Sequence, residues 1–306
     1  MTKIYHRFHE IADQFDVLLF DAYGVFWGGD APIPGSLETM AEQVRRGKPL
    51  CILSNTSSVG NSTIEGYKHK GLTRGVHYTD VITSGDVCLD YLKNNPVIPA
   101  GGRVFMMGIS KINLPKYLNC RVVQTPEEAD FVFFGAPQLT PDQVCLYPDL
   151  QDAFYLDSCG RYDMTTIRPF KALLEKCAAL NLPAISTNPD LMALEKHIGV
   201  AGATWIVRQG ELSENYRRLG GQVLEFGKPY GEMFDYTFRR LGVQPSRRVA
   251  MVGDTYRTDI QGALNAGITP VWCVDTGMAK YELDHGKSLR DQAGGSLDGI
   301  VLIRQV

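Results

Sequence analysis

Four short apolar runs in this sequence each lead into a reactive polar residue, and this pattern restricts the fold more than any other feature. The runs precede Asp21, Ser54, Lys228 and Asp254, and they are Val17–Phe20, Leu50–Leu53, Val223–Phe226 and Val249–Val252. Short continuous runs of Val, Leu, Ile and Phe are typical of strands in a parallel sheet that helices cover on both faces. Such a sheet binds ligands where the carboxyl ends of its strands meet. The pattern therefore predicts a site that combines two carboxylates, a hydroxyl group and an ammonium group, a set suited to phosphoryl transfer.

The segments between these runs have the composition of helices. Residues 57–71 are polar with few helix breakers, residues 230–241 carry apolar side chains at helical spacing, and residues 259–266 end at Gly267. Strands that alternate with helices indicate an α/β fold with a doubly wound, Rossmann-like parallel sheet.

The length of the chain predicts a second domain. With 306 residues and 44% apolar composition, the chain exceeds the usual size of a single domain. The long interval between Ser54 and Lys228 contains further strand-like and helical segments, at 104–107, 122–123, 131–134, 170–180, 184–185 and 205–207. We therefore expect a core formed by residues 1–83 and 223–306, with a large α/β cap domain of residues 84–222 inserted as a lid.

The charge and the cysteine pattern restrict the partners and the location. A net charge of -3 and a pI of about 6.1, without a basic stripe, argue against nucleic acid as the main partner. The seven cysteines show no C-x-x-C spacing, which is typical of reduced packing residues. The first thirty residues include Asp13, Asp16 and Asp21 and only a four-residue apolar run, so neither a signal peptide nor a membrane-spanning helix is expected. These features predict a cytoplasmic protein without a membrane partner.

Asp21 is the candidate nucleophile. It directly follows the first predicted strand, where a carboxylate can attack phosphorus and form an aspartyl phosphate that water later hydrolyses. Gly24 supports this interpretation, because a glycine lets backbone amides approach an anion closely. The alternative is an aspartate that only caps a loop or helix.

Ser54 and Asn55 are candidate phosphate ligands, and Lys228 is a candidate charge stabiliser. Ser54 and Asn55 precede a predicted helix, and a helix N-terminus with a free hydroxyl group binds phosphate, although the same residue types also serve as caps. Lys228 stands between Gly227 and Pro229, where its ammonium group would offset the repulsion between Asp21 and a phosphate dianion. A surface lysine is the alternative for Lys228.

Asp254 and Asp259 form a candidate metal site. The two carboxylates lie five residues apart where a predicted strand turns into a helix. Mg²⁺ prefers hard oxygen ligands together with retained waters and phosphate. The sequence thus predicts Mg²⁺ at Asp254, with Asp259 either as a second ligand or as an acidic residue of the first helical turn.

Together these segments resemble the haloacid dehalogenase (HAD) superfamily, and their order is similar to that of its subfamily IIA, the NagD-like phosphatases with a C2-type cap. The motifs that carry the resemblance are Phe20-Asp21, Leu53-Ser54-Asn55, Thr83-Ser84-Gly85-Asp86, Ser186-Thr187-Asn188-Pro189-Asp190, Gly227-Lys228-Pro229 and Gly253-Asp254 with Asp259.

The resemblance implies a Mg²⁺-dependent hydrolase of a small phosphorylated metabolite, such as a sugar phosphate, a nucleotide monophosphate, or an aryl or acyl phosphate. It assigns Asp21 as nucleophile and metal ligand, the Tyr23 carbonyl group as a further metal ligand, and Asp254 and Asp259 as the remaining acidic metal-site residues. It assigns Ser54 and Asn55 to phosphate, Lys228 to charge stabilisation, and Asn188 and Asp190 to the substrate side of the cap. Relatives in this subfamily often dimerise through the cap, so a homodimer is a further expectation.

Tyr23 departs from the pattern of the family. Its position usually carries a second aspartate, which protonates the leaving group and then activates water. A tyrosine has an unperturbed pKa of about 10, and loss of a positioned acid/base group typically costs ~10²- to 10⁴-fold in rate. We therefore expect slow turnover, least impaired for aryl or acyl phosphates.

Two alternatives remain open at this point. A catalytically weakened protein that binds or senses a phosphorylated metabolite would retain the metal and phosphate ligands without fast turnover. The string Asp21-Ala22-Tyr23-Gly24 also resembles the first motif of the 2-haloacid dehalogenases, but Gly253-Asp254 and the cap motif argue against that activity.

Overall fold

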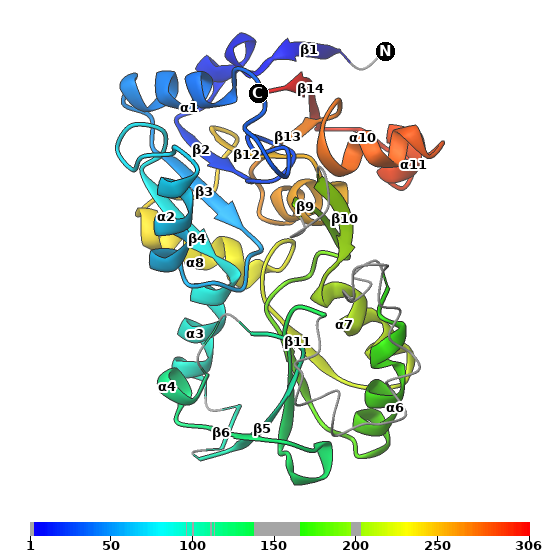
Figure 1. Ribbon diagram of the computed structural model, residues 1–306. Coiled ribbons are helices and arrows are strands. Elements are labelled where there is room, and N and C mark those ends of the chain that lie inside the picture. The colour runs from blue at the N-terminus through cyan, green and yellow to red at the C-terminus, as the bar shows by residue number, and fades with distance from the viewer. Residues whose placement is uncertain are drawn as a thin grey trace.

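The computed structural model describes residues 3–95, 97–99, 101–110, 112, 114–137, 166–196 and 203–306. It contains two parallel sheets and one antiparallel hairpin (Figure 1). The segment that holds Cys145 and Cys159 lies outside the described residues. Cys51, Cys88, Cys120, Cys177 and Cys273 are free and buried, as expected of packing residues. Within the described ranges, no helix has the length and apolar composition that crossing a bilayer requires.

The larger sheet has seven strands, and each neighbouring pair is parallel. In spatial order they are β1 (Ile4–Arg7), β14 (Val301–Gln305), β13 (Thr269–Cys273), β12 (Val249–Gly253), β2 (Val17–Phe20), β3 (Leu50–Ser54) and β4 (Asp80–Thr83). Three of the four apolar runs form its centre, as β12, β2 and β3. The prediction of a doubly wound α/β core with an additional α/β region is confirmed.

Both faces of the larger sheet are covered, which explains why its strands are continuously apolar. Along β2, Leu19 packs into one hydrophobic cluster, whereas Leu18 and Phe20 pack into another on the opposite face. The first cluster contains side chains of α3 (Ser84–Asn94), α8 (Gly231–Leu241) and α9 (Gln261–Asn265), and the second those of α1 (Ser36–Arg45) and α2 (Gly60–His69). A smaller cluster lies under α10 (Gly277–Asp284) and α11 (Leu289–Gln292).

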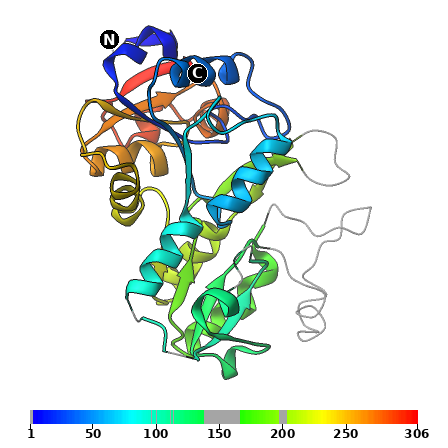
Figure 2. The same cartoon turned by 90° about the vertical axis from the view of Figure 1, so that its left-hand side faces the viewer.

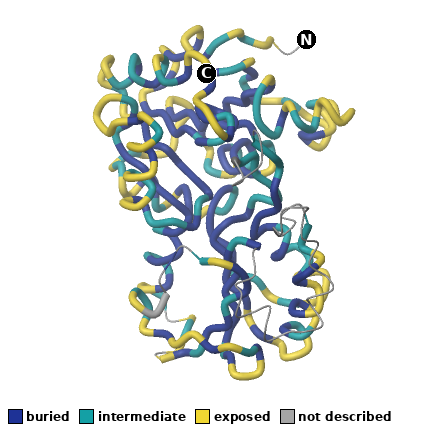
Figure 3. Tube along the Cα trace, viewed as in Figure 1, coloured by how far each residue is buried: buried dark blue, intermediate teal, exposed yellow. Residues whose placement is uncertain are grey.

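The smaller sheet has five parallel strands, in the order β11 (Val223–Glu225), β8 (Ala184–Ser186), β7 (Phe131–Phe134), β5 (Arg103–Met107) and β6 (Arg121–Val123). One face packs on α6 (Lys171–Ala179) and α7 (Gln209–Arg218). The other face shares the cluster that contains α3 and α8, and α4 (Leu114–Leu118) packs beside α3. Figure 2 shows the region of the smaller sheet below that of the larger sheet. In Figure 3, buried segments of the chain continue through the junction between the two regions.

One strand does not lie where the apolar pattern placed it. We expected Val223–Phe226 to join the core sheet, but β11 pairs with β8 at the edge of the smaller sheet. The run returns to the core only after Phe226, whose ring packs at 5.1 Å from that of Tyr91 on α3. An apolar strand can pair with a buried edge strand of either sheet, so its composition alone does not determine which sheet it joins. The exact boundaries at 83/84 and 222/223 stay a prediction.

The hairpin of β9 (Met192–Lys196) and β10 (Ala203–Val207) connects the smaller sheet to the core. The ring of Trp205 packs 4.6 Å from that of Tyr281 on α10. A Cβ atom on Gly29 would lie 2.6 Å from Ala203, so the hairpin also approaches the loop after β2 closely. The hairpin therefore lies against the larger sheet region, although its sequence belongs to the interval of the smaller one.

Candidate active site

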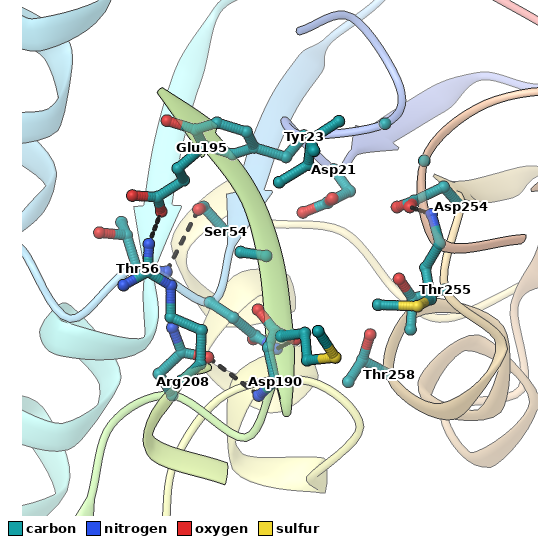
Figure 4. Close-up of a pocket in the computed structure, with 18 of the residues that line it drawn as sticks. Asp21, Tyr23, Ser54, Thr56, Asp190, Glu195, Arg208, Asp254, Thr255 and Thr258 are labelled. Carbon is teal, nitrogen blue, oxygen red and sulfur yellow. Dashed lines mark hydrogen bonds and ion pairs between the residues drawn. The ribbon is translucent and has the colours of Figure 1, made fainter. Parts of the chain in front are cut away.

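A pocket of about 290 Å³ opens where β2, β3 and β12 end. Its floor contains Asp21, Ser54 and Asp254, each located at the end of one of these strands. Figure 4 shows the carboxylate of Asp21 between Ser54 and Asp254. The wall comes from the hairpin and from the segments that precede β9 and α7. The pocket thus lies between the core sheet and the elements attached to the smaller sheet.

Lys228 provides the positive charge of this floor. Its Nζ atom lies 2.5 Å from Asp21 Oδ1 and 2.7 Å from Asp259 Oδ1, and it donates a hydrogen bond of 2.8 Å to the Leu53 carbonyl group. Burial lowers the pKa of Lys228, but Asp21, Asp259 and Asp190 outweigh this effect, so the net shift is upward. The side chain is only 1% exposed and remains a fixed ammonium group.

Asp254 is held by backbone at very close range. Its Oδ2 atom accepts a hydrogen bond of 2.6 Å from the amide of Met278. Gly24 has φ +79°, and a Cβ atom there would lie 2.4 Å from the Asp254 carboxyl carbon. Gly277 has φ +55°, and its Cβ would lie 2.0 Å from Asp254 Oδ2. Only residues without side chains allow the carboxylate to occupy this position.

Asp21, Asp254 and Asp259 offer oxygen atoms that lie within 4.8 Å of one another. Burial and the neighbouring Asp21 and Asp259 raise the pKa of Asp254 well above its usual range. Burial and Asp21 also raise the pKa of Asp259, to about 7, against the opposing effect of Lys228. Asp259 Oδ1 is buried, and the Lys228 ammonium group is the cation that lies against it. Three clustered carboxylates with one cation are incompletely neutralised, and their hard oxygens fit a divalent cation such as Mg²⁺.

Asn55 connects the core to the segment before β9. It donates a hydrogen bond of 2.9 Å to Asp190 Oδ1, and its own Oδ1 accepts one of 2.7 Å from the Lys228 amide. Burial raises the pKa of Asp190 to about 6, although Lys228 opposes this shift. Asn188 Oδ1 accepts from the Asp190 amide at 2.9 Å, and both residues line the pocket. The amide of Thr56 donates to Ser54 Oγ at 3.2 Å, and Ser54 itself lines the floor.

Tyr23 lines the pocket, but its side chain extends away from Asp21 toward Glu195 (Figure 4). Its hydroxyl oxygen accepts a hydrogen bond of 3.0 Å from Lys70 Nζ, the same group that lies 4.5 Å from the ring centroid of Trp27. Burial, together with Glu195, raises the pKa of Tyr23 to about 12. The phenol is therefore a poor base at neutral pH and does not face the candidate nucleophile.

All nine predicted site residues come together around this pocket: Asp21, Tyr23, Ser54, Asn55, Asn188, Asp190, Lys228 and Asp254 line it, and Asp259 lies beneath it against Lys228. Sequence reasoning missed Glu195 and Arg208, which form an ion pair in the wall, and the adjacent Gln209. The only available signal was their short distance in sequence from Asn188 and Asp190.

Comparisons with known proteins identify the family of this chain. Residues 18–114 match the family model of haloacid dehalogenase-like hydrolases, and residues 225–292 match a second model described as HAD-hydrolase-like. The two models together cover more than half of the chain, which belongs to the haloacid dehalogenase superfamily. The matched segments contain Asp21, Ser54, Lys228, Asp254 and Asp259, so the floor of the pocket lies in the part that defines this superfamily of hydrolases.

Individual relatives of this HAD protein are distant. A 4-nitrophenylphosphatase of Schizosaccharomyces pombe is 27% identical over 288 residues, which cover 90% of this chain and 89% of the relative. A putative NipSnap protein of Caenorhabditis elegans is 27% identical over 95% of this chain, but the chain spans only 54% of that relative.

Solved structures show the same fold. A haloacid dehalogenase-like hydrolase of Brucella suis has a TM-score of 0.72 at 22% identity, over 96% of this chain and 95% of that chain. A glycerol phosphate phosphatase of Mycobacterium tuberculosis in complex with magnesium has a TM-score of 0.58 at 22% identity, over 86% of this chain and 69% of that chain.

Proposed function

We propose that this HAD protein is a Mg²⁺-dependent phosphatase of small phosphorylated metabolites that acts through an aspartyl phosphate on Asp21. The observation that carries the proposal is the position of Asp21, which reaches the pocket while Lys228 and two buried carboxylates lie directly beside it. The names of the relatives, which include a 4-nitrophenylphosphatase and a glycerol-3-phosphate phosphatase of Mus musculus, support the reaction class.

Asp21, Asp254 and Asp259, with the carbonyl group of Tyr23, are the proposed metal ligands. A bound Mg²⁺ would neutralise negative charge on the phosphate and on the acidic cluster. The magnesium complex of the mycobacterial relative supports a divalent cation in this family. We propose Mg²⁺ as this cation because the cluster consists of hard carboxylate oxygens and contains neither His nor Cys.

In the first step, an Asp21 carboxylate oxygen forms a bond to phosphorus while the bond to the leaving-group oxygen breaks. Lys228 reduces the repulsion between Asp21 and the phosphate dianion, since its ammonium group already contacts Asp21 Oδ1. Ser54 and Asn55 are the proposed phosphate ligands at the end of β3. Asn188 and Asp190 are the proposed substrate contacts on the side of the cap, and Asp190 also accepts the hydrogen bond that positions Asn55.

In the second step, the oxygen of a water molecule bonds to phosphorus while the bond between phosphorus and the Asp21 oxygen breaks. This restores the Asp21 carboxylate, and the protons of water leave with the phosphate product. Tyr23 occupies the position of the usual base, yet its hydroxyl group is held by Lys70 and its pKa is raised to about 12. We therefore propose slow turnover, with the smallest deficit for aryl or acyl phosphates, whose leaving groups need little protonation.

Two other functions have less support. Binding of a phosphorylated metabolite without turnover would also use Lys228, Ser54 and Asn55, and only rate measurements separate it from slow catalysis. Halide displacement from carbon needs no metal, so it would not use the metal-binding capacity of the cluster formed by Asp21, Asp254 and Asp259. A homodimer and a cytoplasmic location stay predictions.

The test is phosphate release from p-nitrophenyl phosphate, acetyl phosphate and ethyl phosphate with excess MgCl₂ and with EDTA. We expect release from the two activated substrates, loss with EDTA and recovery with Mg²⁺. Asp21→Asn should abolish phosphate release, whereas Asp275→Asn, two residues after β13 and outside the pocket, should not. Metal-dependent binding of phosphate analogues without any release would favour the binding function instead.

A further inference from the structure

The wall opposite Asp21 contains polar groups that the proposed reaction at phosphorus does not use. Arg208 is 8% exposed and forms an ion pair with Glu195 of β9, whose side chain is 34% exposed. Gln209 is 2% exposed, and its Oε1 atom is buried without a hydrogen-bond partner among the described residues. All three residues line the same pocket as Asp21 and Ser54.

Figure 4 shows Arg208 and Glu195 side by side, on the side of the pocket away from Asp254. A phosphate bound at Asp21 would direct its leaving group into the space between the strand ends and this wall. The ion pair leaves no net charge there, and Glu195 and Gln209 both provide acceptor oxygens. A buried acceptor without a partner is costly unless the ligand supplies a donor.

We propose that Glu195, Arg208 and Gln209 select an uncharged, hydroxyl-bearing leaving group and reject a carboxylate. This inference rests on the phosphatase function proposed above and assigns its specificity to three residues. Substrate hydroxyl groups donate to Glu195 and Gln209 and accept from Arg208. A substrate carboxylate offers no donor to either acceptor and is repelled by Glu195, and it reaches Arg208 only by displacing that counter-ion.

The experiment compares glycerol 3-phosphate and phosphoglycolate, which are similar in size but end in hydroxyl groups and a carboxylate respectively. Each is measured as a competitive inhibitor of p-nitrophenyl phosphate hydrolysis in the presence of Mg²⁺. We expect phosphoglycolate to have an inhibition constant at least tenfold higher than that of glycerol 3-phosphate. In Glu195→Gln, which keeps the shape but removes the charge, this ratio should fall by tenfold or more because Arg208 is no longer neutralised.

Gln209→Met should raise the inhibition constant of glycerol 3-phosphate about 3- to 10-fold relative to that of phosphoglycolate, which is the effect of one lost hydrogen bond. Glu211→Gln is the matched control, because Glu211 lies in the first turn of the same helix outside the pocket. An unchanged ratio in Glu195→Gln, or a wild-type preference for phosphoglycolate, overturns the specificity proposal while leaving the phosphatase function intact. If wild type does not cleave p-nitrophenyl phosphate with Mg²⁺, both proposals fail together.

Discussion

The floor and the wall of the pocket differ in how the chain builds them. The floor consists of side chains at the ends of β2, β3 and β12, adjacent parallel strands that are buried on both faces. The wall consists of a two-stranded hairpin and the start of α7, and its side chains are only partly buried at Glu195 and Trp205. A parallel sheet holds its strand ends in fixed register, whereas a hairpin is positioned by what it packs against.

This difference indicates a division of tasks. The floor groups, Asp21, Lys228 and Asp254, address phosphate and metal, which every substrate of the proposed reaction shares. The wall groups, Glu195 and Arg208, face the part of the substrate that varies. Changes in the floor should therefore affect all substrates alike, while changes in the wall should affect their ranking.

Replacement of Lys228 should have the largest effect and tests the role of the floor. This lysine follows a strand of the smaller sheet, yet its ammonium group contacts Asp21 on the floor. Lys228→Met removes the cation between Asp21 and Asp259. We expect kcat for p-nitrophenyl phosphate to fall by ~10²- to 10³-fold, as on removal of other preorganised electrostatic groups. Lys280→Met, an exposed lysine of α10 paired with Asp284, is the control. A folded Lys228→Met protein with nearly normal kcat would contradict the electrostatic role.

Gly24 tests how tightly the floor is packed. Gly24→Ala places a Cβ atom 2.4 Å from the Asp254 carboxyl carbon, so Asp254 must move. We expect the Mg²⁺ concentration for half-maximal activity to rise by about 10- to 100-fold, the usual effect of displacing groups around a metal.

Gly47→Ala is the matched control for Gly24→Ala. Gly47 has nearly the same backbone conformation, with φ +78° against +79°, but no atom lies within 4 Å of its added Cβ. If both variants retain wild-type Mg²⁺ dependence and helical circular dichroism, the close approach at Asp254 has no functional importance.

Tyr23 lies where floor and wall meet, and its replacement should restore the missing acid/base group. In Tyr23→Asp we expect hydrolysis of ethyl phosphate to rise by about tenfold or more relative to p-nitrophenyl phosphate. Tyr23→Phe keeps the ring but not the hydroxyl group and should leave this ratio near that of wild type. A gain in Tyr23→Phe equal to that in Tyr23→Asp would mean that relief of packing, not proton transfer, changes the rate.

The smallest effect is expected far from the pocket, in the smaller sheet. Asp130 accepts hydrogen bonds from the Arg103 side chain and amide, which lower the pKa of Asp130 to about 2. Because the folded pKa lies below the unfolded value of 3.8, the ionised form stabilises the fold above pH 4, and this contribution disappears as the pH falls toward 2.

Asp130→Asn should therefore unfold at lower urea than wild type at pH 7, with a difference that vanishes between about pH 4 and 2. The activity per folded molecule should not change, since Asp130 lies outside the pocket. Arg103→Gln, which removes the cation, should abolish the same pH-dependent difference. A persistent difference at pH 2 would show that the ion pair is not its source.

Much of the floor was predictable because its signals are local. An apolar run followed by a polar residue specifies both a buried parallel strand and what stands at its end, as at Asp21, Ser54 and Asp254. The helical spacing in residues 230–241 and the stop at Gly267 were likewise sufficient, because helix period and glycine conformation act over a few residues. The smaller sheet could be expected from length, and its strands from further apolar runs.

The residues of the wall and the pairing partner of one strand could be identified only from the tertiary structure. Composition marked Val223–Phe226 as a strand, but only the packed edge of β8 decided which sheet it joins. Proximity in sequence to Asn188 and Asp190 was the only local signal for Glu195 and Arg208, because the contact of Trp205 with Tyr281 positions the hairpin that carries Glu195 and leads into Arg208. The sequence by itself determined the parallel core and the candidate chemical groups at its strand ends. The tertiary structure decided which groups face them and that the Tyr23 phenol turns away, because such contacts join residues far apart in the chain and depend on packing rather than local pattern.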